Sequence, residues 1–349
     1  MVHLAKLTTM LNQMSVSVIA NNFNGERFLP NLLSSLRAQR GVTLEIIVVD
    51  RHSTDKSLEI LSQQLDITVV HLPPELGLAA GYAAGVLKAA CGNLFFCNED
   101  MWFDPDCLHN LEKQISRERR IGIADPWQWD YQGAQVIHMG TQLVRHWDPR
   151  SVLPTWSFEQ SPHIPGGELT AMACAGAMMI DRSVYEEIGG WDTSFFLDYE
   201  DTDLCIRAWQ RGWHCVTVPE ARVFHALGMS NANVLPAVRT TVGRRRYVSA
   251  SSNYIIVAAK YFRWRSVLLA VLARIDRFLR NSIKLRFKLA FLDLESLWLS
   301  IRRLPQALQF RRSNRLWSSN RPGEGFFLDP AFRPRTANTR EEVGAKHGT

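Results

Sequence analysis

Four carboxylates crowd into six consecutive positions near the middle of the chain, and they are the side chains best suited to chemistry. They are Asp198, Glu200, Asp201 and Asp203. Close packing of like charges raises the cost of ionising all of them. Such a cluster is therefore suited to hold a proton, a cation or a polyhydroxylated ligand. The alternative is an acidic first turn of a helix, which the helix dipole favours without any ligand.

A second group of polar side chains follows short apolar runs, at the points where strands would end. They are Asn22, Asn24, Asp50, Asn98, Glu99 and Asp100, after apolar runs at 16–20, 44–49 and 94–97. Asp50 could accept hydrogen bonds from a base or ribose, or cap the next helix. Glu99 and Asp100 could hold a hard divalent cation together with phosphate oxygens, or simply form an acidic turn. His225 is either a phosphate or metal contact or an ordinary partly buried histidine.

The elements that must position these residues alternate between strands and helices. Further strands are predicted at 67–72, 172–181 and 215–218, and helices at 29–36, 58–65, 77–90 and after the acidic cluster, with a helix start at Asp104-Pro105. This alternation predicts βαβ units and a mostly parallel sheet flanked by helices. Ligands bind beyond the carboxyl ends of the strands in such sheets. We therefore expect the strand-end residues to converge in one cleft.

The charge of the chain is strongly asymmetric. Residues 239–315 contain 18 Lys and Arg against three acids, so this region carries +15 and the remainder −9, for a net charge of +6. Apolar residues three or four apart over 264–279, with arginines between them, predict an amphipathic helix with a basic face. This pattern suits an anionic membrane surface better than a nucleic-acid groove. The alternative is a helical subdomain that packs on the core.

Composition and length narrow the class of protein further. A chain of 349 residues with 46% hydrophobic content can bury one large core or two modest ones. The six cysteines show no metal-ligand spacing and predict reduced, buried thiols. Residues 1–14 contain no secretory apolar segment, and no run reaches the ~18 apolar residues of a membrane span. We expect a cytoplasmic protein, peripheral on the inner face of the cell membrane, with domains at 14–238 and 239–315 and a mobile polar tail at 316–349.

Seven motifs in order resemble the family 2 inverting glycosyltransferases, and most closely their bacterial rhamnosyltransferase branch. They lie at 17–25, 47–55, 77–81, 98–100, 174–182, 189–192 and 200–204. The resemblance runs from about residue 16 to residue 230 and more loosely to residue 261. It implies a GT-A fold, a nucleotide-diphosphate sugar donor with dTDP-rhamnose as the best guess, and a divalent metal, Mg²⁺ or Mn²⁺. It also implies a glycan or polyprenyl-linked acceptor.

The resemblance implies a role for each candidate residue. Asn22, Asn24, Asp50, Asn98 and Glu99 would bind the nucleotide sugar, Asp100 and His225 the metal, Trp191, Asp192 and Glu200 the acceptor, and Asp201 would be the general base. Two departures stand out. Residues 98–100 are not a strict Asp-x-Asp, which leaves metal binding to Asp100 with help from His225. Arg51 and His52 follow Asp50 where smaller polar residues are commoner.

Two other functions compete with a sugar transferase of this kind. A processive polysaccharide synthase would need membrane spans and a Gln-x-x-Arg-Trp motif, but Lys260 stands where Gln belongs. A non-catalytic glycan-binding or scaffold protein would share the fold without the chemistry. Such a protein has no reason to keep Asp50, Asp100 and Asp201 together, so the residues favour the enzyme.

Overall fold

Two strands near the N-terminus show how this sequence builds its sheet. Successive side chains of a strand point to opposite faces, and both faces of β1 (Val16–Asn22) and β2 (Leu44–Asp50) are buried. Ile19 packs in one apolar cluster, while Val18 and Ala20 pack in a second cluster on the other face. This explains why the two runs are almost continuously apolar, as is typical of strands covered on both sides.

The computed structural model describes residues 16–73, 75–146, 155–160, 169–226 and 241–314. In this part of the chain, a nine-stranded sheet has the order β3-β2-β1-β4-β10-β6-β11-β5, and β7 pairs with β6. The remaining strands of this sheet are β3 (Ile67–His71), β4 (Asn93–Asn98), β5 (Met101–Phe103), β6 (Ile121–Asp130), β7 (Val136–His138), β10 (Ala177–Asp181) and β11 (His214–His225). A separate hairpin pairs β8 (Thr141–His146) with β9 (Thr155–Gln160).

The predicted α/β fold class is confirmed, with a curled sheet that is parallel through its N-terminal half. β3, β2, β1 and β4 are paired in parallel, as are β6 and β11. β10 enters between β4 and β6 in the antiparallel direction. β5 also pairs antiparallel with β11, and this brings the end of β11 beside the turn that follows β4.

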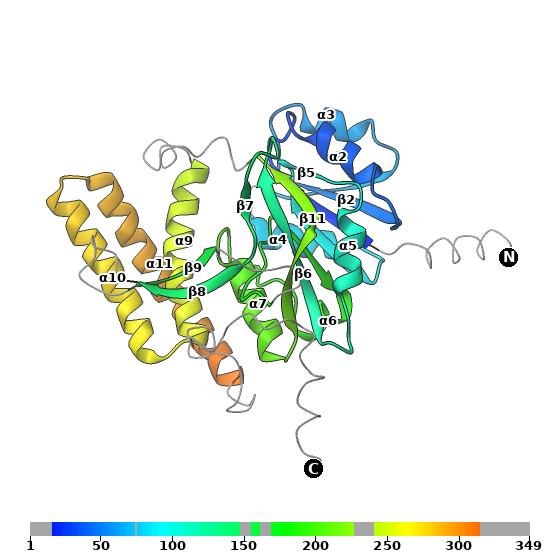
Figure 1. The fold of residues 1–349 in the computed structure, drawn as a ribbon. Coiled ribbons are helices and arrows are strands. Elements are labelled where there is room, and N and C mark those ends of the chain that lie inside the picture. Colours follow the sequence, from blue (N-terminus) through cyan, green and yellow to red (C-terminus); the bar gives the residue numbers. More distant parts are fainter. Residues whose placement is uncertain (1–15, 74, 147–154, 161–168, 227–240, 315–349) are drawn as a thin grey trace, which may run out of the picture.

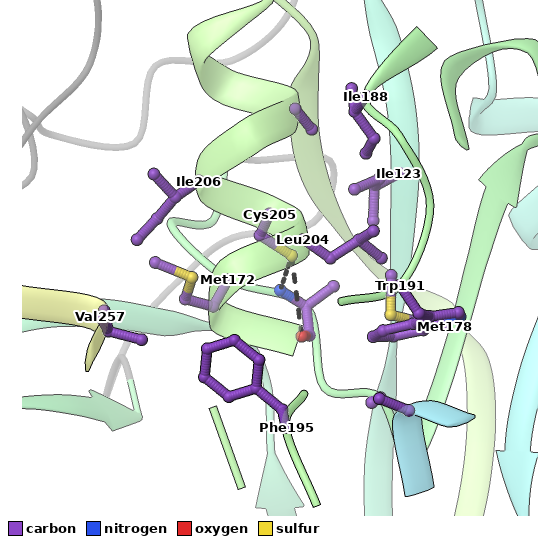
Figure 2. Close-up of a cluster of buried hydrophobic side chains, with 14 of the residues drawn as sticks. Ile123, Met172, Met178, Ile188, Trp191, Phe195, Leu204, Cys205, Ile206 and Val257 are labelled. Atoms are coloured by element: carbon purple, nitrogen blue, oxygen red, sulfur yellow. Dashed lines mark hydrogen bonds between the residues drawn. The ribbon is translucent and has the colours of Figure 1, made fainter. Parts of the chain in front are cut away.

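Helices cover the two faces of the sheet (Figure 1). One face packs against α2 (Leu29–Arg37), α3 (Ser57–Ser62) and α5 (Cys107–Gln114), and the other against α4 (Leu78–Val86), α6 (Arg182–Glu187) and α7 (Glu200–Gln210). Figure 2 shows the core around α7, where Leu204 lies on the side of Ile123 and Met178, and Ile206 lies on the other side with Met172 and Val257. The helix that carries the acidic cluster is thus fixed by its apolar face.

Three long helices stand beside this sheet domain: α9 (Thr241–Tyr261), α10 (Trp264–Ile283) and α11 (Phe287–Asn314). α9 lies next to the sheet domain in Figure 1. Tyr254 and Val257 of α9, and Phe262 directly after it, belong to the same apolar cluster as the buried residues of α7. Within the described residues, no helix is both long enough and apolar enough to cross a bilayer. The predicted tail at 316–349 lies outside the described residues.

Several predicted boundaries differ from the structure. The helix expected to start at Asp104-Pro105 begins at Cys107, because the Asp104 carbonyl accepts a bond from the Cys107 amide in a preceding turn. Only the second half of the run at 172–181 forms β10, since residues 172–176 make a loop at the sheet edge. β11 is longer than predicted and reaches His225. All six cysteines are free, as predicted, and all but the half-buried Cys174 are buried.

Candidate functional site

A cleft of about 840 Å³ opens at the edge of the sheet where the predicted strand ends meet. Its lining includes the turn after β4, the loop at 174–176, the first turn of α7 and the end of β11. Asn98, Glu99, Asp100, Glu200, Asp201 and His225 all line this cleft. Six candidate residues that are up to 127 positions apart in sequence thus share one cavity.

Asp201 lies in the first turn of α7 with both carboxylate oxygens bound by backbone amides. Oδ2 accepts from the Ala175 amide at 3.1 Å and Oδ1 from the Thr202 amide at 2.7 Å. Burial raises the pKa of Asp201, and these two amides act in the opposite direction by stabilising the charged form. The loop at 174–176 therefore supplies a donor that holds the Asp201 carboxylate in place.

Glu200 is only 4% exposed, and its Oε2 has no hydrogen-bond partner among the described residues. Burial and the charge of Asp201 raise the pKa of Glu200 well above its ordinary value. Two adjacent carboxylates in a low-dielectric site oppose each other's ionisation and titrate as a pair. Amide bonds to both Asp201 oxygens stabilise its charged form, so Glu200 is the member of the pair that binds a proton first.

The turn before α7 has an unusual backbone. Asp198 and Tyr199 both have a positive φ, at 66° and 72°, a region that bulky L-residues rarely adopt. α9 holds this turn: Asn253 donates to the Leu197 and Asp198 carbonyls at 3.0 and 2.7 Å. Arg246 makes an ion pair with the Asp198 carboxylate at 3.1 Å. The strained turn that aims Glu200 and Asp201 is therefore secured from the helical bundle.

Asp100 and His225, the predicted metal pair, lie close together in the cleft, and metal binding by them stays a prediction. His225 Nε2 lies 3.3 Å from Asp100 Oδ1, while its Nδ1 lies 3.0 Å from Gln128 Oε1. In the tautomer with the proton on Nδ1, the Gln128 oxygen is its acceptor and Nε2 turns a lone pair toward Asp100. A cation between Nε2 and the Asp100 oxygen would then satisfy both acceptors.

Within the described residues, no three His, Cys, Asp or Glu side chains are grouped to hold a metal ion. Mg²⁺ commonly binds through one or two protein ligands and completes its shell with substrate phosphates and water. The facing acceptors of Asp100 and His225 fit a cation of that kind.

Glu99 completes the turn and packs closely against the loop after β1. Burial, and next the charge of Asp100, raise the pKa of Glu99 to about 7. A Cβ at Gly25 would lie 2.8 Å from the Glu99 Cγ atom and 2.3 Å from Asn22 Oδ1. Glycine is therefore required at position 25 for the two loops to approach.

The three remaining strand-end residues form an internal network instead of lining the cleft. The Asp50 side chain is fully buried, and it accepts from Asn22 Nδ2 at 2.7 Å and from Ser53 Oγ at 2.6 Å. Asn24, exposed and at φ 55°, accepts a bond from the Thr54 amide. This network ties the loop after β1 to the loop after β2. Nucleotide binding by Asn22, Asn24 and Asp50 stays a prediction.

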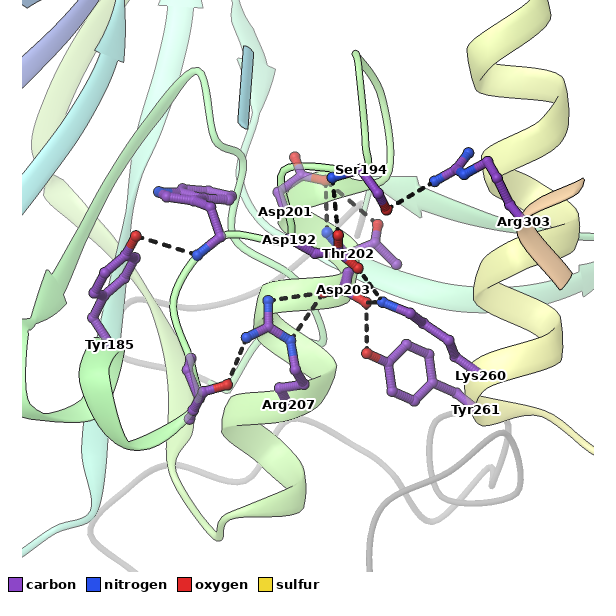
Figure 3. Close-up of polar contacts among 12 residues, drawn as sticks. Tyr185, Asp192, Ser194, Asp201, Thr202, Asp203, Arg207, Lys260, Tyr261 and Arg303 are labelled. Atoms are coloured by element: carbon purple, nitrogen blue, oxygen red, sulfur yellow. Dashed lines mark hydrogen bonds and ion pairs between the residues drawn. The ribbon is translucent and has the colours of Figure 1, made fainter. Parts of the chain in front are cut away.

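The predicted acceptor residues Trp191 and Asp192 are also placed away from the cleft lining. Trp191 is 5% exposed and stacks on Tyr82 in the core, with ring centroids 5.3 Å apart. Asp192 accepts a bond from the Lys260 ammonium at 2.6 Å (Figure 3). The structure therefore gives Trp191 a packing partner and Asp192 an ion-pair partner, and acceptor binding by these two residues stays a prediction.

Asp203, the last member of the acidic cluster, is the centre of a buried ion network (Figure 3). It receives Lys260 Nζ at 2.6 Å, Tyr261 Oη at 2.6 Å and Arg207 Nε at 2.9 Å. Although burial opposes ionisation, Lys260 and Arg207 lower the pKa of Asp203 to about 2. This carboxylate is structural, because it fastens α7 to the C-terminal end of α9.

Two cationic residues of the cleft were not among the predicted site residues. Arg51 lines the cleft, and its Nε is buried without a partner among the described residues. Arg246 reaches the same cleft from α9. The position of Arg51 directly after Asp50 could have indicated it, whereas Arg246 belongs to a run of three arginines that reads as part of the basic surface.

A buried ion pair behind the cleft was also not predicted. His138 Nε2 lies 2.8 Å from Asp125 Oδ2, and Asp125 Oδ1 accepts from the Cys174 amide at 3.2 Å. Burial works against the charge, but Asp125 and then Asp201 raise the pKa of His138. The loop at 174–176 is thus held by Asp125 on one side and by Asp201 on the other.

Comparison with known proteins agrees with this fold. The model of the family described as glycosyl transferase family 2 matches residues 17–189. An N-acetylglucosaminyl-diphospho-decaprenol L-rhamnosyltransferase of Mycobacterium tuberculosis is 26% identical over 288 residues, 76% of this chain and 89% of that protein. The dTDP-rhamnosyl transferase RfbF of Shigella flexneri is 23% identical over 212 residues, 59% of this chain and 68% of that protein.

A solved structure shows the same fold. The crystal structure of GalNAc-T7 with UDP, GalNAc and Mn²⁺ superposes with a TM-score of 0.53 at 19% sequence identity. The match covers 72% of this chain and 48% of that one, so this chain spans about half of the larger protein. The similarity identifies the sheet domain as a GT-A fold.

Proposed function

We propose that this glycosyltransferase, a member of glycosyl transferase family 2, transfers L-rhamnose from dTDP-rhamnose to a hydroxyl of a glycan or lipid-linked glycan. The sugar and the acceptor class are supported by two relatives whose names specify rhamnosyl transfer. One of them acts on a sugar diphosphate attached to decaprenol. A lipid-linked acceptor would place this chain at the inner face of the cell membrane, where the basic region 239–315 would contact anionic lipid.

The observation that carries the proposal is that a carboxylate suited to act as a base and two residues suited to hold a cation line the same cleft. The Asp201 carboxylate is held by backbone amides on one wall, and Asp100 faces His225 on another. A base on one side can accept a proton while a cation site on the other binds a diphosphate. Inverting sugar transfer needs both functions at once.

Asp201 acts as the general base in this proposal. The acceptor hydroxyl oxygen attacks the anomeric carbon as its proton passes to Asp201, and the bond from that carbon to the diphosphate oxygen breaks. One in-line displacement inverts the anomeric carbon. The amide bonds from Ala175 and Thr202 favour the ionised form of Asp201, which is the form that a general base requires.

Asp100 and His225 would hold a divalent cation, Mg²⁺ or Mn²⁺, whose remaining ligands come from the donor diphosphate. Such a cation neutralises the charge that develops on the leaving group. Gln128 keeps the His225 imidazole oriented with Nε2 toward Asp100. Arg51 and Arg246 add positive charge to the same cleft and favour binding of the anionic donor.

The test replaces the proposed base and compares it with its neighbour. Asp201→Asn keeps the size of the side chain but removes the proton acceptor, so kcat should fall by about 10²- to 10⁴-fold. Glu200→Gln should retain a rate near that of the unchanged protein, because Asp201 keeps both of its amide donors in that variant. Transfer from dTDP-rhamnose to an N-acetylglucosaminyl diphospholipid is measured in the presence of Mn²⁺.

Donor affinity is the control for this pair of variants. Binding of dTDP-rhamnose, measured by calorimetry, should be equal in both variants because neither removes a group on the diphosphate side. Full activity in Asp201→Asn would eliminate Asp201 as the base. Donor binding without transfer in the unchanged protein, with every acceptor tried, would instead indicate a non-catalytic glycan-binding protein.

A further inference from the structure

The exposed apolar side chains of this protein are concentrated on one helical hairpin. Twelve of the sixteen large apolar side chains that are exposed in the described residues belong to α10, α11 and the turn between them. Single exposed apolar residues are normal on a protein surface, but a contiguous patch marks an interaction surface. The hairpin of α10 and α11 is such a surface.

Both helices carry their exposed apolar residues as a stripe with helical spacing. On α10 the stripe is Trp264, Leu268, Leu272, Ile275, Leu279 and Ile283, and on α11 it is Phe287, Phe291, Leu294, Trp298 and Ile301. Steps of three and four residues keep each stripe on one side of its helix. The stripes run the full length of α10 and the first half of α11.

A groove of about 670 Å³ lies where the two stripes meet. Ile275 from α10 and Phe291, Trp298 and Ile301 from α11 line it, and Ile255 of α9 forms part of its lining. All lining residues are apolar except Glu295 and Ser300. Because residues from both stripes line one groove, the stripes belong to the same face of the hairpin.

Cations border this apolar face. At the tip of the hairpin, Ile283, Leu285 and Phe287 alternate with Lys284, Arg286 and Lys288, and all six residues are exposed. None of these three cations pairs with a carboxylate among the described residues. Toward the other end, exposed Arg265 lies next to Trp264, and the Arg302 guanidinium carbon is 4.6 Å from the Trp298 ring.

We propose that the hairpin of α10 and α11 is a lipid-binding element that lies in the interface of an anionic bilayer. The apolar stripes would enter the boundary between headgroups and acyl chains, and the bordering Lys and Arg residues would contact anionic headgroups. Trp264 and Trp298 are of the residue type that favours this depth. The inference rests on the proposed function only in that a lipid-linked acceptor explains why the enzyme binds there.

Charge distinguishes a bilayer from a second copy of the chain as the occupant of this face. Two copies packed face to face would bring two basic borders together, with no acidic surface in the hairpin to match them. Asp276 and Glu295, the exceptions near the face, are already paired with Arg280 and Arg244. An anionic membrane complements both the apolar stripes and the cations.

The test measures binding to vesicles and requires no sugar transfer. The full chain is sedimented with vesicles of phosphatidylcholine alone and with vesicles of equal parts phosphatidylcholine and phosphatidylglycerol. We expect binding to the mixed vesicles that weakens as salt is added. The triple variant Lys284→Ala, Arg286→Ala, Lys288→Ala should bind them about 100-fold more weakly, because each cation near an anionic surface contributes roughly fivefold.

The matched control removes the same charge from the sheet domain. Lys56, Lys88 and Lys113 are exposed on other elements, and their triple replacement by Ala should leave vesicle binding unchanged. A second variant, Phe287→Ser with Phe291→Ser, should also lose binding, whereas Leu65→Ser with Leu87→Ser should keep it. Circular dichroism establishes that each variant is folded.

Three results would overturn the inference. They are binding that survives both hairpin variants, an equal loss in the control variants, and concentration-dependent self-association that the hairpin variants abolish without any vesicle binding. Transfer to a lipid-free acceptor in the absence of vesicles is recorded in parallel. Normal transfer with no vesicle binding would remove the lipid inference alone and leave the proposed function intact.

Discussion

The carboxylates of the acidic cluster differ because each has different neighbours. Asp203 is surrounded by Lys260, Arg207 and the Tyr261 hydroxyl and stays ionised. Glu200 has no donor for its buried Oε2, and its pKa is raised well above the ordinary value, while Asp201 receives two amide bonds. A single helical turn thus contains a paired structural anion and two carboxyl groups that differ in their hydrogen-bond donors.

The raised pKa of Asp201 predicts the pH dependence of transfer. A protonated carboxyl cannot accept the acceptor proton, so kcat/KM should fall as the pH decreases through the pKa of Asp201 in the folded protein. This acidic limb should lie above the ordinary range of an aspartate, because burial and the charge of Asp198 raise the pKa. Asp198→Asn should move the limb to lower pH.

Asp66→Asn is the matched control for that shift, since Asp66 forms an exposed ion pair with Arg37 on another part of the protein. Its pH profile should match that of the unchanged enzyme. An acidic limb that stays in place in Asp198→Asn would mean that a group other than Asp201 controls the rate.

The sequence predicted Asp100, Glu200, Asp201 and His225 well enough that all four lie in one cleft. It could not determine how a strand-end carboxylate is used. Asp50 sits at a position where a ligand could bind, yet Asn22 and Ser53 take up its oxygens. The position of a residue in the sequence does not show which groups will hydrogen-bond to its side chain. Only the structure shows that Asp50 is bound by its neighbours, whereas Asp201 lines the cleft.

At the scale of elements, α7 and α9 behave as one unit. Asp203 of α7 is fully buried against Lys260 at the end of α9, and Lys260 also binds Asp192. Removing one partner of a buried ion pair leaves an uncompensated charge, which costs far more than losing a surface pair. This contact is therefore a buried polar attachment of the helical bundle, in addition to the bonds from Asn253 and Arg246 to the turn before α7.

Asp203→Asn should lower the free energy of unfolding by about 3–5 kcal/mol, because Lys260 and Arg207 would remain buried without their anion. Urea unfolding at neutral pH measures this change. Asp66→Asn, which breaks an exposed pair, should cost about 1 kcal/mol or less. Similar losses for the two variants would contradict a structural role for the Asp203 network.

The same carboxylate predicts acid sensitivity. The pKa of Asp203 is about 2 in the folded protein against 3.8 for the free side chain. Its stabilisation is complete above the unfolded value and is lost as the pH falls from about 4 toward 2. The stability difference between the unchanged protein and Asp203→Asn should therefore shrink over this interval.

Periodicity predicted most helices and the parallel strands, because their apolar patterns are local. It did not predict the short β5 or the antiparallel direction of β10. Both depend on which strand lies alongside, β11 for β5 and β4 for β10. The start of α5 was predicted too early. The Asp104 carbonyl accepts a bond from the Cys107 amide in a turn that precedes the helix, and the sequence alone does not distinguish this turn from a helix cap.

At the scale of the whole molecule, the apolar core is continuous from the sheet to the bundle. One cluster includes Ile180 of β10, Trp209 of α7, Val257 of α9 and Ala307 of α11. The composition of the chain changes near residue 239, but the packing does not stop there. The two regions that differ most in charge thus depend on one core for stability.

Thermal unfolding should accordingly occur in one cooperative transition. Differential scanning calorimetry should give a van't Hoff enthalpy close to the calorimetric enthalpy, and circular dichroism at helical and aromatic wavelengths should give coincident curves. Two separated transitions would show that the bundle and the sheet domain unfold independently.

The left-handed turn at Asp198 and Tyr199 connects the helical bundle to the first turn of α7. Asn253 and Arg246 of α9 hold that turn by its carbonyl groups and its carboxylate, and Asp201 follows within three residues. A shift of α9 along its axis must pull on these bonds. If the hairpin binds a membrane and Asp201 is the base, as proposed above, α9 is the helix that connects the two.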